Sequence, residues 1–99
     1  MLQGEWEKHR ATPFPAGCRG KGIAGFDLIA LDYTTAGCIQ TYLARGSLDP
    51  HRLSLLGLCY HALGKVNAEL TGDGSEDFRF LETAARHVLE AIRDAAGPD

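Results

Sequence analysis

The sequence predicts an all-α fold: an antiparallel three-helix bundle with an N-terminal arm that can add a short fourth helix. Three long segments place apolar residues at helical spacing, and no segment alternates with the period of two that marks a strand. Capping residues stand at the ends of these segments, and the short connections between them favour antiparallel neighbours. We divide the chain into an arm, residues 1–25, and a bundle domain, residues 26–99.

The composition is that of a small soluble globular domain. The 99 residues are 44% hydrophobic and 23% charged, which suits one domain with one core. A net charge of −3 with scattered basic residues excludes nucleic acid and anionic membranes as expected partners. The N-terminus lacks the apolar region of a signal peptide, and no apolar run reaches the roughly 20 residues of a membrane span. We therefore expect a cytoplasmic protein.

The arm contains two different stretches. Residues 2–10 can form a short helix, which is marginal in water unless Trp6 docks on the bundle. Residues 11–25 combine prolines, which favour extended backbone, with closely spaced glycines. We expect this second stretch to lie over the bundle, anchored by Phe14 and Ile23.

The first long helix is expected over residues 27–45, with Asp27 as its N-cap and Gly46 as the residue that ends it. Its core stripe consists of Leu28, Leu31, Thr35, Ile39 and Tyr42. Asp32 falls near the middle of this stripe, where a carboxylate needs hydrogen-bond donors or a cation, or its pKa must rise. We expect Asp32 to be mostly buried and hydrogen-bonded to the arm.

The other two helices follow after short turns. The second begins at Asp49 and Pro50, an N-cap followed by a proline in the first helical position, and ends near residues 71–72. The third is expected over residues 76–95, with Ser75 as its cap. Their core stripes consist of Leu53, Leu56, Cys59, Tyr60, Leu63, Val66 and Leu70, and of Phe78, Leu81, Ala85, Val88, Leu89 and Ile92.

Small residues recur outside these core stripes. On the second helix they form a row beside two leucines: Gly57, His61, Gly64 and Ala68, with Leu55 and Leu58. A similar row on the first helix consists of Ala30, Gly37, Thr41 and Ala44. Glycine within a helix costs about 1 kcal/mol relative to alanine and is often kept where another backbone approaches closely. We therefore expect the arm or a second copy of the protein to cover one of these rows.

No motif in the chain specifies an enzyme. A GxGxxG match at residues 20–25 lacks the preceding strand of a dinucleotide site, because the residues before it, TPFPAGCR (12–19), cannot form a central strand. A short extended pair is expected only around residues 18–24. The acidic stretch 73–77 lacks the glycine and the closing acid of a calcium loop. Neither the histidines nor the cysteines have metal-ligand spacing, and we read Cys38 and Cys59 as buried small hydrophobes. We predict no metal, no cofactor and no assigned catalytic residue.

Two functions remain open. The first is a protein-interaction or regulatory domain that forms a homodimer through one of the small-residue rows. Its interface candidates are Gly57, His61, Gly64, Ala68, Leu55 and Leu58. The alternative is a small ligand-binding protein or enzyme with a site between the arm and the helices, around Arg19, Asp32 and His61. An interaction domain should show a flat apolar patch, and a ligand protein a concave site of about 300 Å³ or more that includes Asp32.

Three stretches of the chain carry a resemblance to a known group: WEKHRATPFPAG (6–17), RG (19–20) and GFDLIALD (25–32). They resemble small hypothetical proteins of high-GC actinobacteria, most strongly over residues 6–39. The resemblance implies that the arm and Asp32 are integral parts of the fold. It implies no activity, ligand or site.

Overall fold

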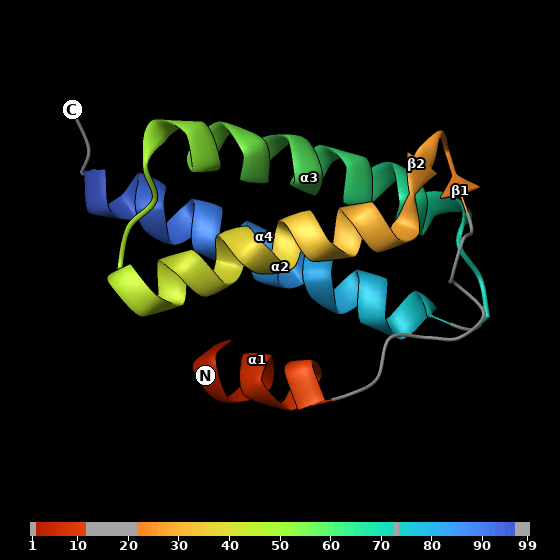
Figure 1. The fold of residues 1–99 in the computed structure, drawn as a ribbon, viewed down its shortest axis with the longest axis horizontal. Helices are drawn as coiled ribbons and strands as arrows, with labels where there is room; N and C mark the ends of the chain where they lie inside the picture. Colours follow the sequence, from red (N-terminus) through yellow and green to blue (C-terminus); the bar gives the residue numbers. More distant parts are fainter. Residues whose placement is uncertain (1, 12–21, 73, 97–99) are drawn as a thin grey trace.

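The computed structural model describes residues 2–11, 22–72 and 74–96, and helices hold 83% of these residues. Four helices and one short hairpin follow one another as α1 (Leu2–Ala11), β1 (Gly22–Ile23), β2 (Phe26–Asp27), α2 (Leu28–Arg45), α3 (Pro50–Glu69) and α4 (Ser75–Ala96). The three long helices pack together, each antiparallel to the next along the chain, and α1 lies beside them (Figure 1). The predicted all-α fold is confirmed.

The ends of α2 follow from the residues that flank it. The Asp27 carboxylate accepts hydrogen bonds from the backbone N–H of Ile29 (2.9 Å) and of Ala30 (3.3 Å), which have no partner inside the helix. Gly46 adopts the left-handed conformation (φ 77°) and donates its N–H to the Tyr42 carbonyl at 2.6 Å. Both predicted ends of this helix are therefore correct to within one residue.

The predicted ends of the other long helices need small corrections. Asp49 caps α3 as expected, since its carboxylate accepts from the N–H of Arg52 at 3.1 Å. However, α3 ends at Glu69, because Leu70 turns to an extended conformation (ψ 126°) and buries its side chain. Ser75 is the first residue of α4 and not the cap before it.

The core lies where the three predicted stripes meet. Its buried apolar residues in the long helices are Leu28, Leu31, Cys38, Ile39, Leu56, Cys59, Ala62, Leu63, Val66, Phe78, Leu81, Ala84, Ala85 and Val88. Both cysteines are buried free thiols, as expected. Thr35 is also fully buried, and its hydroxyl has no hydrogen-bond partner among the described residues.

The short helix α1 is held by its aromatic residue. Trp6 is 2% exposed and stacks near the ring of Phe80 in α4, with 6.4 Å between ring centroids. The sequence predicted that Trp6 must dock, and this is confirmed. Two residues were predicted to anchor the stretch 11–25. Ile23 is half-buried against the core, and Phe14 lies outside the described residues.

Candidate functional site

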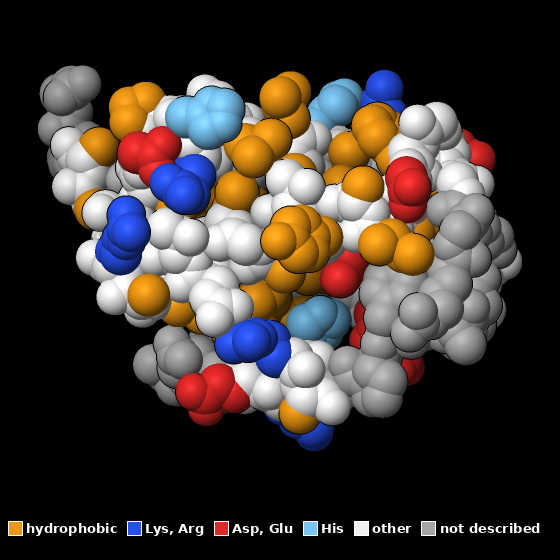
Figure 2. All heavy atoms as spheres, in the orientation of Figure 1, with side chains coloured by type: hydrophobic (Ala, Val, Ile, Leu, Met, Phe, Trp, Pro, Cys, Tyr) orange, Lys and Arg blue, Asp and Glu red, His pale blue; other side chains and the backbone are white. Residues whose placement is uncertain are grey.

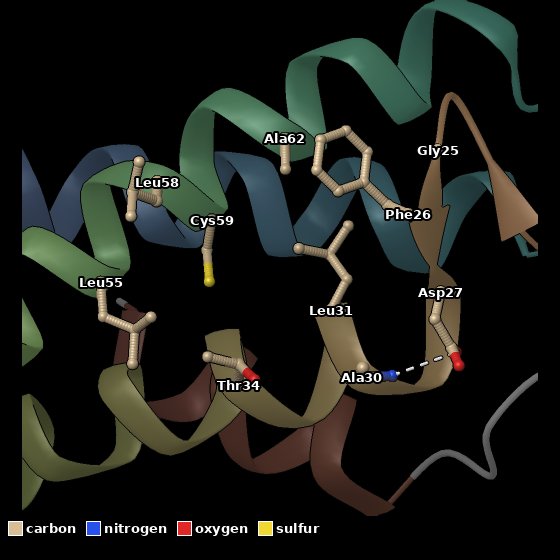
Figure 3. A pocket seen from close by; sticks show the side chains of 10 residues that line it. All are labelled: Gly25, Phe26, Asp27, Ala30, Leu31, Thr34, Leu55, Leu58, Cys59 and Ala62. Carbon is tan, nitrogen blue, oxygen red and sulfur yellow. Dashed lines mark hydrogen bonds between the residues drawn. The ribbon is translucent and has the colours of Figure 1, made fainter.

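A hollow of about 320 Å³ opens between α2, α3 and the hairpin, and we call it the α2–α3 groove (Figure 3). Most of its lining is apolar. It is lined by Gly25, Phe26, Asp27, Ala30, Leu31, Thr34, Leu55, Leu58, Cys59 and Ala62. The buried residues Leu31, Cys59 and Ala62 belong to the core beneath it, so the groove is an opening onto the core itself.

The hairpin closes one end of this groove because of its tight turn. Ala24 and Gly25 both have positive φ angles, 55° and 85°, as a two-residue hairpin turn of the primed type requires. The turn pairs Ile23 with Phe26 and directs the Phe26 ring toward α3 (Figure 3). The short extended pair predicted around residues 18–24 thus begins at Gly22, and residues 18–21 lie outside the described residues.

The exposed side of α2 lies beside the groove and is largely apolar, and at its far edge Gln40 and Ala44 border a hollow that Glu7 and Arg10 of α1 also line. In α2, which is described over its whole length, every exposed residue before Arg45 is uncharged. We call these residues the α2 outer face: Ile29, Ala30, Tyr33, Gly37, Gln40 and Ala44. Tyr33 is 79% exposed, and across the groove Leu58 of α3 is 68% exposed. Figure 2 shows hydrophobic side chains gathered over the middle of this side of the molecule.

The six predicted interface residues divide between two sides of α3. Leu55 and Leu58 line the groove beside α2. Gly64 instead faces α4, since a side chain there would meet Glu82 at 3.7 Å. Gly57 is half-buried with open space at its missing side chain, and His61 and Ala68 are exposed. The six residues therefore do not all lie on one side of α3, because Gly64 faces α4 and the two leucines line the groove, and their role in an interface stays a prediction.

Asp32 and His61 are not brought together. Asp32 is half-buried, and its charged neighbours are His9 of α1 and Asp77 of α4. Burial raises the pKa of the Asp32 carboxyl, His9 lowers it, and Asp77 raises it further. No described residue donates a hydrogen bond to Asp32, and Arg19 lies outside the described residues. This position agrees with the predicted burial of the acid, whereas the hydrogen bonds predicted from the arm involve residues 12–21, which lie outside the described part of the chain. The net effect of its described surroundings is to disfavour its charge.

A second, more polar hollow of about 310 Å³ lies between α1 and the start of α4. It is lined by Glu5, Lys8, His9, Glu76, Asp77 and Phe80. The His9 ring stacks on Phe80 with 4.7 Å between centroids, and its Nδ1 lies 3.9 Å from an Asp77 oxygen. Neither His9 nor Phe80 was predicted from the sequence, because neither lies on a predicted core stripe and their contact joins residues distant in the chain.

The predicted ligand site around Asp32 and His61 does not coincide with either hollow. Neither residue lines the α2–α3 groove or the hollow beside α1. The groove exceeds the volume expected of a ligand site but lacks Asp32, and an exposed apolar surface adjoins it. Among the described residues, no three His, Cys, Asp or Glu side chains are grouped as a metal site would need.

Comparison of the chain with family models, with curated proteins and with solved structures finds no match. In the described part of the chain, no helix is both long enough and apolar enough to cross a membrane.

Proposed function

We propose that this chain is a protein-interaction domain that binds its partner on the α2 outer face and in the adjoining α2–α3 groove. One observation carries the proposal: over most of its length α2 turns an uncharged surface with an exposed aromatic ring toward the solvent. Depletion of charged residues together with enrichment in tyrosine is typical of the centre of a protein interface.

The groove supports the same proposal because it is a shaped apolar recess next to a flat surface. Anchor residues of protein partners characteristically fill such recesses, where they are fully desolvated. Leu55 and Leu58 form one wall, and Phe26 lies at one end. An aliphatic or aromatic side chain seated there would bury both itself and this wall, at roughly 25 cal/mol for each Å² of apolar surface removed from water.

Site-specific photo-cross-linking in the host cell tests the proposal. A photoreactive phenylalanine analogue replaces Tyr33 on the α2 outer face, and in a matched control it replaces Glu90 on the exposed side of α4. We expect a discrete protein adduct from position 33 and none from position 90. Leu58→Glu should reduce the adduct, because it places a charge at the edge of the groove.

Two results would contradict the proposal. The first is that no protein adduct forms at position 33. The second is that equal adducts form at positions 33 and 90, because random collision would then explain both.

A further inference from the structure

We infer that the partner is a second copy of this chain, docked so that the two α2 helices run antiparallel about a two-fold axis at Gly37. This inference rests on the proposed interaction function and adds the identity of the partner and the geometry of the contact. It follows from four properties of α2: its symmetry, its open centre, the charges at its ends and its area.

Two alanines lie symmetrically about the centre of the exposed side of α2. Gly37 lies at the middle of the helix Leu28–Arg45. Seven positions away on either side are Ala30 and Ala44, and four positions away are Tyr33 and Thr41. A two-fold axis requires that residue i contacts residue j while j contacts i. About Gly37, this sets Ala30 of one copy against Ala44 of the other, and the Tyr33 ring against the smaller Thr41.

The centre of the helix is open enough for a second backbone to approach. A side chain at Gly37 would meet no described atom within 4 Å, so no described packing within one copy explains a glycine there. Such a glycine costs about 1 kcal/mol relative to alanine. The neighbouring Thr41 hydroxyl donates to the Gly37 carbonyl at 2.9 Å, which satisfies its polar group within the helix. Contact with an apolar surface would therefore leave the Thr41 hydroxyl paired.

The charges at the two ends of α2 are complementary in the antiparallel arrangement. Asp27 is exposed just before the first turn, and Arg45 is exposed in the last turn. Antiparallel docking brings Asp27 of one copy toward Arg45 of the other, at both ends of the contact. It also opposes the two helix dipoles, which is the favourable orientation. A parallel arrangement would place like charges together.

The available area suits a weak dimer. With 18 residues, α2 is about 27 Å long and about 10 Å wide with its side chains. Its outer face therefore offers roughly 270 Å² for each copy, or roughly 540 Å² in total, and the exposed Leu58 at the edge of α3 adds to this area. Stable specific interfaces bury about 1,200–2,000 Å² in total, so a contact of this size is that of a weak complex. We therefore expect dissociation in the micromolar range.

Sedimentation equilibrium of the purified full chain, from low micromolar to near-millimolar concentration, tests the inference with two glycine variants. Gly37→Gln places a long side chain on the proposed axis, and Gly57→Gln is the matched control on α3. Both missing side chains face open space, and glutamine favours helix, so both variants should fold at least as stably as the wild type. We expect the wild type and Gly57→Gln to approach twice the 10.7 kDa of one chain. Gly37→Gln should dissociate about tenfold to a hundredfold more readily.

A disulfide experiment tests the position of the axis. In a Cys18→Ser background, Gly37→Cys should form an intermolecular disulfide under mild oxidation, because two copies of residue 37 meet at the axis. Gly57→Cys should not, and the native Cys38 and Cys59 are buried.

A monomeric wild type at every concentration would overturn the inference, and so would dissociation of Gly57→Gln with Gly37→Gln unaffected. The cross-linking result tests the proposed function independently of the homodimer. If the purified protein is monomeric but position 33 cross-links in the cell to a different protein, the interaction surface stands and the homodimer is wrong. If position 33 gives no adduct at all, the interaction function itself is wrong.

Discussion

The helices α4 and α2 each bury one stripe of side chains in the core, but they expose opposite kinds of surface. Between Glu76 and Asp94, the exposed side of α4 carries charges of both signs. Between Leu28 and Ala44, α2 contains one charged residue, Asp32, and it is only half-exposed. The exposed side of α4 is what a helix facing water requires. The exposed side of α2 lacks that adaptation, which is why we assign the interaction to it.

The largest expected effect is a loss of stability when a buried ring of α4 is removed, compared with removal of an exposed ring of α2. Phe78 is fully buried, and Phe78→Ala should lower the free energy of unfolding by about 3–5 kcal/mol, because it removes a ring from the core and leaves a cavity. Tyr33→Ala removes a ring of similar size from the α2 outer face and should change the free energy of unfolding by less than about 0.5 kcal/mol. Chemical denaturation at a concentration too low for dimerisation measures both. A loss below about 1 kcal/mol for Phe78→Ala would show that α4 does not pack as described.

A smaller effect should appear on the buried side of α2. Thr35→Val replaces a fully buried hydroxyl that has no described partner with a methyl group of the same shape. We expect the free energy of unfolding to rise by about 1–2 kcal/mol, because the unfavourable desolvation of that hydroxyl is removed. Thr41→Val is the control, since the Thr41 hydroxyl already donates to a carbonyl and gains nothing by removal. If Thr35→Val destabilises the protein by as much as Thr41→Val does, the Thr35 hydroxyl has a partner in solution.

The smallest effect concerns Asp32, the one charge along most of α2. Burial and Asp77 raise its folded pKa above the ordinary value of 3.8, against the opposing effect of His9. The folded state therefore binds this proton more tightly than the unfolded state does. The penalty from the charge is present near neutral pH and is relieved as pH falls through the folded pKa.

Asp32→Asn should accordingly be slightly more stable than the wild type at pH 7, by about 0.5 kcal/mol for a half-exposed group. The difference should shrink as the pH is lowered from 7, because the folded wild type takes up this proton at a higher pH than the unfolded chain does. Paired denaturation curves across this range measure it. If the wild type is instead more stable than Asp32→Asn at pH 7, hydrogen-bond donors stabilise the charged carboxylate, as was predicted from the sequence.

Residues close together in the chain determined most of the secondary structure. Helix ends were predicted correctly at Asp27, Gly46, Asp49 and Pro50. A capping residue acts on backbone groups within four residues of itself, so its effect can be read from the local sequence. The spacing of apolar residues predicted the buried side of each long helix, because the side on which a residue lies depends only on its rotation about the axis of that helix. The requirement that Trp6 dock could also be predicted, because a helix as short as α1 is unstable alone.

The number of long helices, most of their ends and their buried sides could thus be predicted from local patterns. The neighbour that each remaining side meets depends on how the helices pack. This packing turned Gly64 toward α4 while Leu58 faces the groove, set Asp32 beside His9 and Asp77, and opened the groove between α2, α3 and the hairpin. These outcomes depend on the mutual rotation of whole helices, which is fixed by contacts between residues far apart in the chain and leaves no periodic signal within any one of them.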